Sequence, residues 1–236
     1  LSITDDFFRK GNENQLMFYF RNLALYNKGI LLDGLLKYNN RLGVKALYFP
    51  WRSDSRETEY GHYLYEELGY INEAHRWSFE AMVVWGQTAQ HVTNLAKYNI
   101  VLGRNDIANK FINILESTLF YKDIAENLRE CLSEGNVPDL KVSKQSDLKI
   151  RFSNVMNIGP ELDYLCSNDP NNRMALEYLI ADLLLSNNVV RLIDVINKYR
   201  DYLNDKLINS NIVQQALFIY KLGVGEESFN KKGITL

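Results

Sequence analysis

The chain has 236 residues, of which 46% are hydrophobic and 24% are charged, and this composition is that of an ordinary globular protein. Its 27 basic and 29 acidic residues give a formal net charge of −2. They form no basic stripe of the kind that follows a phosphate backbone, so no nucleic-acid partner is expected. No stretch approaches the roughly 20 apolar residues of a membrane span. Because proline breaks helix interiors, the presence of only 4 prolines favours a mostly helical chain.

The first helical pattern is Glu13–Lys28, in which apolar residues recur at near-helical spacing before Gly29 ends the pattern. A second helix over about Ile30–Arg41 would complete a hairpin. The next stretch, Gly43–Asp54, includes Pro50, which biases the preceding residue towards an extended backbone. We therefore expect an ordered loop between this hairpin and the helices that follow.

The clearest part of the sequence predicts two helical hairpins and one further helix. The hairpins pair Arg56–Leu68 with Ile71–Trp85 and Thr88–Leu102 with Asp106–Thr118, and the further helix is Tyr121–Glu134. Thr88 is expected to cap the second hairpin, because its hydroxyl can accept a hydrogen bond from a free backbone N–H of the first turn.

Residues 135–149 are polar, poor in apolar residues and without periodicity, which is typical of a linker or a long loop. Beyond them the pattern predicts helices over Arg173–Ser186, Val189–Tyr202 and Asn211–Leu222, followed by a polar tail, Glu226–Leu236. The sequence thus predicts an N-terminal helical-repeat block over 1–134, a linker over 135–149 and a C-terminal helical-repeat block over 150–236.

A glycine, an alanine and an aromatic residue occur twice at the same offsets, 34 residues apart, as Gly69, Ala74, Trp77 and as Gly103, Ala108, Phe111. This spacing is the period of the tetratricopeptide repeat. Each glycine lies between two helical patterns, where a left-handed residue lets the second helix fold back on the first. Each alanine then falls where the paired helices come closest. Over about half of its length the chain resembles a tetratricopeptide-repeat protein.

The resemblance returns in the C-terminal block. Asp169-Pro170-Asn171-Asn172 is a tetrapeptide that commonly joins one such repeat to the next, and Asn187 then takes the place of the turn glycines. The resemblance implies an all-α fold, a right-handed superhelix of antiparallel helix hairpins whose first helices line a groove. It also implies a scaffold that binds a protein or peptide rather than a catalyst.

Residues 70–77 and 169–179 more loosely resemble an uncharacterised family of bacterial proteins, in which a membrane-embedded N-terminal part precedes a soluble helical-repeat part. That resemblance implies an extracytoplasmic or periplasmic setting, with this segment tethered to the membrane through a missing N-terminal part. It implies no activity. The chain begins without Met and lacks a signal-type apolar region, so we expect a fragment or a processed product.

By analogy with the repeat fold, seven residues should face the groove: Arg56, Glu59, Tyr63 and Glu66 from one repeat, and Gln90, Thr93 and Lys97 from the next. They make no two-cation clamp, by which some tetratricopeptide domains hold a peptide's C-terminal carboxylate, so that function is not expected.

An aromatic-rich segment lies before and along the first clear repeat, and flat aromatic side chains suit peptides or sugar rings. Its members are Tyr48, Phe49, Trp51, Tyr60, Tyr63, Tyr65 and Trp85. Core packing is the simpler interpretation for most of them, and Trp51 and Tyr63 are the best candidates for exposed binding. The predicted ligand-binding surface is Trp51, Arg56, Glu59, Tyr63, Glu66 and Lys97.

No residue pattern argues for catalysis, a metal ion or a cofactor. His62 and Glu66 stand at i and i+4 without a third ligand nearby, so a helix-surface pair is the simpler interpretation. His75, beside Arg76 and Trp77, is interpreted as a polar residue of the repeat packing. Whether Cys131 and Cys166 pair is left open, and buried free thiols are the simpler case.

The sequence therefore predicts a non-enzymatic scaffold that binds a protein or peptide. Glycan capture by surface aromatics, as in a carbohydrate uptake system, is the alternative from another class. Hydrolase activity is a third and weaker alternative.

Overall fold

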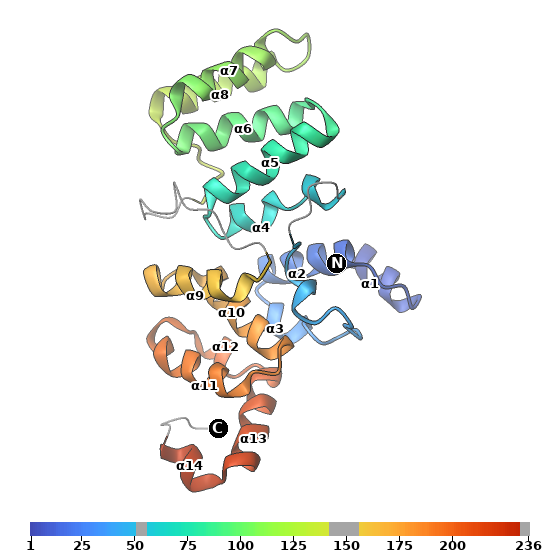
Figure 1. The fold of residues 1–236 in the computed structure, drawn as a ribbon, viewed down its shortest axis with the longest axis vertical. Coiled ribbons are helices and arrows are strands. Elements are labelled where there is room, and N and C mark those ends of the chain that lie inside the picture. Colours follow the sequence, from blue (N-terminus) through green and yellow to red (C-terminus); the bar gives the residue numbers. More distant parts are fainter. Residues whose placement is uncertain (51–55, 142–155, 232–236) are drawn as a thin grey trace. The chain divides into compact units, whose positions relative to one another are not determined.

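The computed structural model describes residues 1–50, 56–141 and 156–231, and these ranges contain fourteen α-helices and no strand (Figure 1). The all-α prediction is confirmed. The chain forms two compact units: unit 1 comprises Leu1–Phe49 and Asn157–Leu236, and unit 2 comprises Pro50–Met156. None of the helices in the described ranges is both long and apolar enough to cross a membrane.

The N-terminal part of unit 1 has three helices, α1 (Ser2–Arg9), α2 (Gln15–Asn27) and α3 (Leu31–Gly34), and a 3₁₀ turn, η1 (Gly43–Ala46). Asn14 begins α2, because its side-chain oxygen accepts hydrogen bonds from the backbone N–H groups of Leu16, at 2.8 Å, and Met17, at 3.3 Å.

The C-terminal part of unit 1 has six α-helices and one 3₁₀ turn. They are α9 (Ile158–Asn168), α10 (Arg173–Leu185), α11 (Val189–Lys198), η4 (Arg200–Tyr202), α12 (Asp205–Ile208), α13 (Asn211–Val224) and α14 (Glu226–Lys231). The short helix α3 packs against both α10 and α13. In addition, Lys206 donates a hydrogen bond to the carbonyl oxygen of Gly29 at 2.6 Å. The first 49 residues therefore fold with the end of the chain, which differs from the division into blocks 1–134 and 150–236.

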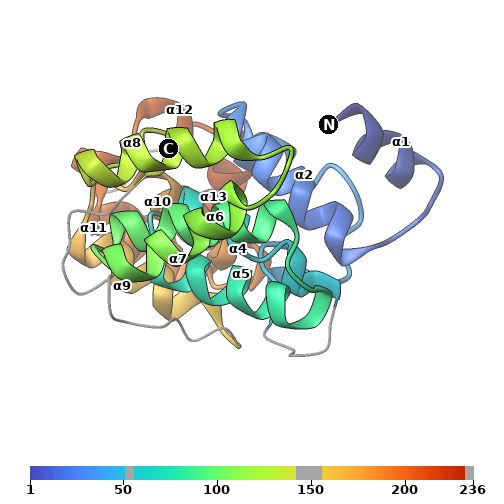
Figure 2. The same cartoon turned by 90° about the horizontal axis from the view of Figure 1, so that it is seen from above.

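Unit 2 contains η2 (Arg56–Glu59), α4 (His62–Glu67), α5 (Ile71–Trp85), α6 (Ala89–Val101), α7 (Asn105–Glu116) and α8 (Lys122–Glu134). Consecutive helices pack on one another from α4 to α8, and Figures 1 and 2 show them stacked in chain order. Helix α8 buries Ala125 and Leu128 on one side and exposes Glu126 and Glu130 on the other. Such a polar outer face suits the last helix of a stack.

The hairpin turns have the predicted backbone geometry. Gly69, Gly103 and Asn187 have φ angles of +71°, +70° and +54°. After each one the next N–H reaches back to a carbonyl oxygen of the preceding helix, and for Gly103 this bond joins Arg104 to Asn99 at 2.8 Å. This pattern closes a helix with a left-handed residue. Ala74 and Ala108 have no exposed surface, as expected for residues at a close helix crossing.

Several helix boundaries differ from the prediction. The expected helix Arg56–Leu68 is divided into η2 and α4, with Gly61 between them. The expected helix Ile30–Arg41 is only the short α3, which ends at Gly34. The Leu25 side chain packs closely on Gly34 and would lie 2.6 Å from an added Cβ. The tail is not wholly polar coil, since Phe229 of α14 is buried against the unit.

Part of the expected linker belongs to unit 2. The Val137 side chain is 2% exposed, Asp139 lies 3.7 Å from the ammonium of Lys97, and Lys141 forms an ion pair with Glu67. One apolar anchor and two ionic contacts therefore hold residues 137–141 against the helices. The rest of that stretch, residues 142–149, lies outside the described residues.

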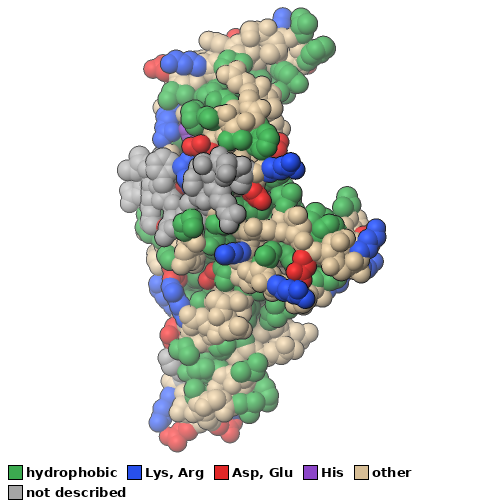
Figure 3. Space-filling model, turned by 45° about the vertical axis from the view of Figure 1, so that its right-hand side comes forward, with side chains coloured by type: hydrophobic (Ala, Val, Ile, Leu, Met, Phe, Trp, Pro, Cys, Tyr) green, Lys and Arg blue, Asp and Glu red, His purple; other side chains and the backbone are tan. Residues whose placement is uncertain are grey.

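Charges of both signs are interspersed on the face of the molecule seen in Figure 3. Lysine and arginine side chains alternate there with acidic ones, and hydrophobic and uncharged polar side chains lie between them.

Candidate binding groove

The predicted groove residues lie on the first helices of the unit 2 hairpins. Arg56 and Glu59 are exposed in η2, and Tyr63 on α4 is 39% exposed. Glu66 on α4 is half-buried. Trp51, the remaining member of the predicted surface from this part of the chain, lies outside the described residues.

Helix α6 carries the other predicted positions. Gln90 is exposed and donates a hydrogen bond to the side-chain oxygen of Asn94 at 2.8 Å. Thr93 and Lys97 are half-buried one and two turns further along the helix. Their spacing of three and four residues puts all three on one side of α6.

A hydrogen bond joins the two predicted stripes. The hydroxyl of Tyr98, on α6, donates to the carboxyl group of Glu66, on α4. Burial raises the pKa of Glu66 to about 7, and the hydrogen bond from Tyr98 and the nearby charge of Lys97 oppose that rise. Burial likewise raises the pKa of Tyr98 well above its ordinary value. The pair therefore connects α4 and α6. No sequence motif marked Tyr98.

Beside these residues is a cavity of about 370 Å³, which we call the α6–α8 pocket. Thr93 and Lys97 of α6 form one wall. The remaining lining residues come from α8 and the segment after it: Ile124, Asn127, Leu128, Cys131, Val137, Pro138 and Asp139. The apolar part of the lining comes from Ile124, Leu128, Val137 and Pro138, and the polar groups include Lys97, Asn127 and Asp139. Such a mixture of apolar lining and a few polar groups is typical of small binding sites.

The sequence identified two of the nine lining residues, Thr93 and Lys97. It missed the α8 wall because the groove prediction did not extend to that helix. A signal was present there, since Ile124, Leu128 and Cys131 repeat at helical spacing. Val137 and Pro138 belong to the stretch that the sequence predicts to be a linker, so they were not expected to line a site.

The histidines that the sequence singled out are packed into the unit. His62 is 3% exposed, and its ring lies 4.0 Å from that of Tyr63. Burial lowers the pKa of His62 to about 4, and the nearby His91 adds to this effect. The interpretation of His62 and Glu66 as a surface pair is therefore wrong, because His62 is buried and Glu66 bonds to Tyr98. No group of three His, Cys, Asp or Glu side chains in the described ranges could hold a metal ion.

The segment around His75 fits a packing role. The ring of His75 stacks on that of Phe79, with the two ring centroids 6.3 Å apart. Burial, together with the charge of Arg104, lowers the pKa of His75 to about 4. Glu73, with no exposed surface, forms an ion pair with Arg76, and Trp77 is fully buried.

Both cysteines are free thiols. Cys131 is half-buried in the α6–α8 pocket, so the expectation of buried thiols applies only to Cys166, which has no exposed surface. Burial raises the pKa of Cys166 to about 12, which keeps it protonated and unreactive near neutral pH.

The aromatic residues divide between core and surface. Tyr48, Phe49 and Tyr65 are buried, as the packing interpretation expected. Tyr63 and Trp85 are 39% and 45% exposed, and the Trp85 indole N–H donates to the hydroxyl oxygen of Thr58 at 3.3 Å. Of this set, Tyr63 and Trp85 are therefore accessible, and the Tyr63 ring packs on His62 while Trp85 is held by its bond to Thr58.

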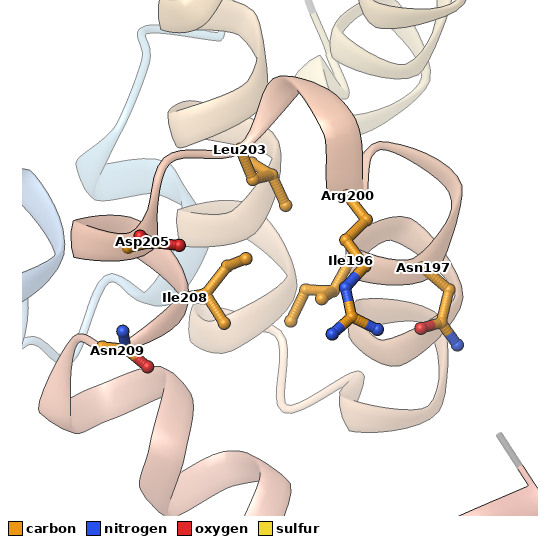
Figure 4. A pocket seen from close by; sticks show the side chains of 7 residues that line it. All are labelled: Ile196, Asn197, Arg200, Leu203, Asp205, Ile208 and Asn209. Atoms are coloured by element: carbon orange, nitrogen blue, oxygen red, sulfur yellow. The ribbon is translucent and has the colours of Figure 1, made fainter. Parts of the chain in front are cut away.

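Unit 1 has a separate cavity of about 320 Å³, formed where the chain passes from α11 to α12 (Figure 4). Ile196, Leu203 and Ile208 make its apolar part. Arg200 and Asn197 lie on one side and Asp205 and Asn209 on the other. None of these residues was predicted to bind a ligand.

A family model matches residues 6–235, nearly the whole chain, and its description is Family of unknown function (DUF6057). The chain belongs to this family. No curated protein and no solved structure matches the chain.

Proposed function

We propose that this member of a family of unknown function is a non-enzymatic scaffold that binds a peptide or a protein segment in unit 2. The observation that supports this most directly is the α6–α8 pocket, because Thr93 and Lys97 were expected to face a groove and both line it. Its volume of about 370 Å³ is that of a small ligand site, enough for one or two side chains of a peptide.

We also propose that unit 2 follows the right-handed tetratricopeptide-like arrangement, in which first helices line the groove. The left-handed turns at Gly69 and Gly103, the buried Ala74 and Ala108, and the polar outer face of α8 support this arrangement. In this arrangement α4, α6 and α8 are the first helices, and Tyr63, Glu66 and Lys97 belong to the same binding surface as the pocket.

Selection from a random peptide display library would test the peptide proposal. Enriched peptides should bind the purified protein in calorimetry. Thr93→Trp, which fills the pocket from its α6 wall, should weaken them about tenfold or more, as expected when a central contact is lost. Lys110→Trp on the exposed side of α7 is the matched control and should bind as the wild type. Failure to enrich any peptide, or equal binding by Thr93→Trp after circular dichroism shows it folded, would contradict the proposal.

Glycan binding is the second candidate, favoured by the exposed rings of Tyr63 and Trp85. A glycan array probed with the wild type and with Tyr63→Ala and Trp85→Ala separates it from peptide binding. Loss of array signal in these variants, with peptide binding retained, would favour the glycan candidate.

We further propose the extracytoplasmic, membrane-tethered setting that the resemblance to bacterial membrane proteins implies. The full-length protein with a C-terminal tag should sediment with membranes, and external protease should remove the tag after the outer envelope is opened. Protection of the tag until the inner membrane is lysed would place this segment on the other side.

A further inference from the structure

The loop between α7 and α8 exposes two adjacent large apolar side chains. Leu119 is 85% exposed and Phe120 is 86% exposed, the highest values for large hydrophobic residues in the described ranges. Tyr121, which follows, is 38% exposed. Figure 1 shows this loop at the end of the α7–α8 hairpin. Full exposure of neighbouring Leu and Phe side chains is unfavourable in water, so we expect another surface to cover them.

The exposed position is built into the hairpin. Arg129 of α8 donates hydrogen bonds to both carboxylate oxygens of Glu116, at 2.8 and 3.0 Å, and to the side-chain oxygens of Asn109 and Asn113 on α7. The Thr118 hydroxyl accepts from the N–H of Tyr121 at 3.3 Å and donates to the carbonyl of Leu115 at 2.7 Å. These bonds fix the base of the loop, so little further ordering is needed when its tip binds.

The charges around the tip suit a lipid headgroup layer. Residues 117–122 contain no carboxylate, and Lys122 is exposed. The nearest carboxylate on the α7 side, Glu116, is neutralised by Arg129, whose side chain lowers the pKa of Glu116. Asp123, in the first turn of α8, is the one acidic residue directly beyond the tip. Tyrosine and lysine next to an apolar tip are residues that extend their polar ends to the headgroup level.

We propose that Leu119 and Phe120 insert into the interfacial region of a lipid bilayer, with Tyr121 and Lys122 at the headgroups. Because the two side chains are almost fully exposed in the loop at the end of the hairpin, a fluid surface can surround them without a preformed complementary cavity. This contact is separate from the α6–α8 pocket and does not depend on the proposed peptide binding. Since one myristoyl chain binds a bilayer with only about 10⁴ M⁻¹, the two shorter side chains should bind reversibly, at millimolar lipid.

Cosedimentation with large unilamellar vesicles tests the proposal, using phosphatidylcholine alone and phosphatidylcholine mixed equally with phosphatidylglycerol. The wild type should sediment with both, and added salt should release little of it from the neutral vesicles. Leu119→Ser/Phe120→Ser should bind about a hundredfold more weakly or worse, because burial of each of the two apolar side chains contributes about tenfold or more. Phe218→Ser/Leu222→Ser on α13, which removes two side chains that are 53% and 70% exposed, is the matched control and should bind as the wild type.

Three results would overturn the proposal: a wild type that stays in the supernatant at every lipid concentration, a Leu119→Ser/Phe120→Ser variant that sediments like the wild type, or a control that loses binding equally. The first result would be expected if the tip instead enters a pocket of another protein. Because the loop is exposed, circular dichroism should show that the serine variant retains its helices.

Discussion

The indole of Trp77 lies directly on the backbone of Gly61. A Cβ atom at residue 61 would come within 2.1 Å of Cε3 of Trp77, closer than any real contact. Trp77 has no exposed surface, and the ring of Tyr65 stacks beside it with the centroids 6.3 Å apart. The indole therefore has no free space to move into. Packing requires glycine at this position, between η2 and α4.

Gly61→Ala should consequently destabilise the protein by about 1–3 kcal/mol, the usual cost of overpacking a core. Gly223→Ala is the control, because nothing lies within 4 Å of the added methyl group in α13. Alanine there should stabilise the helix by roughly 0.5–1 kcal/mol. Urea unfolding followed by circular dichroism measures both changes, and equal midpoints for Gly61→Ala and the wild type would contradict the packing described for Trp77.

Local features of the fold could be predicted from the sequence. Helix α5 has the predicted bounds, and Thr88 caps α6 by accepting from the N–H of His91 at 3.2 Å. Turns, caps and apolar spacing depend on residues close together in the chain, so one sequence contains the necessary information. The break at Gly61 was not predicted, and neither was the packing of Trp77 on that glycine, because Trp77 belongs to the next helix, α5.

The division into units depends on distant contacts. Helix α3 lies against α10 and α13, which follow it by well over a hundred residues, and no local pattern indicates that pairing. The candidate site shows the same limit. Thr93 and Lys97 follow from helical register, whereas Val137 enters the pocket only because its segment folds back on α6 and α8.

The hairpin turns offer a second prediction. Gly103 has φ +70° and no atom within 4 Å of an added Cβ, so only backbone strain opposes a side chain there. Gly103→Val should therefore destabilise by about 1–2 kcal/mol. Asn187 has φ +54°, and Asn187→Gly should be neutral or slightly stabilising, because glycine adopts this conformation more easily. Thermal and urea unfolding check both changes. A large loss in Asn187→Gly would show that the asparagine side chain itself matters.

Glu66 should make unit 2 less stable as the pH rises. Its pKa is about 7 in the fold against an ordinary value of 4.5, so the folded state holds a proton that the unfolded state releases. This contribution to stability is complete below the ordinary pKa and is lost as pH rises through about 7. Glu66→Gln should remove that loss. The free energy of unfolding of the variant should therefore fall less than that of the wild type between about pH 5 and about pH 8. Tyr98→Phe should deepen the loss, since it removes a bond that favours the carboxylate.

His62 should act in the opposite direction. Its pKa is about 4 in the fold against an ordinary 6.5, so its neutral form is favoured there. Its contribution is complete above 6.5 and is lost as the pH falls towards about 4. Between about pH 4.5 and 6.5 the opposite effects of Glu66 and His62 on the free energy of unfolding partly cancel in the wild type. The stability of Glu66→Gln should therefore fall more steeply than that of the wild type as the pH decreases. Urea unfolding across this range measures it. An unchanged pH dependence in Glu66→Gln would show that the carboxyl is not buried as described.

Limited digestion with trypsin tests how the chain is divided. The stretch around Lys144 and Lys149, outside the described residues, has few apolar residues, so the first cuts are expected there rather than at Arg76 or Lys110 on helices. The two blocks predicted from the sequence would then separate as independent fragments. In the structure, however, unit 1 contains chain from both sides of the cut, and α3 contacts α10 and α13. The two fragments should therefore elute together in gel filtration and separate only in denaturant. Separate elution under native conditions would contradict the composition of unit 1, and first cleavage at Arg76 or Lys110 would contradict the stability assigned to the helices of unit 2.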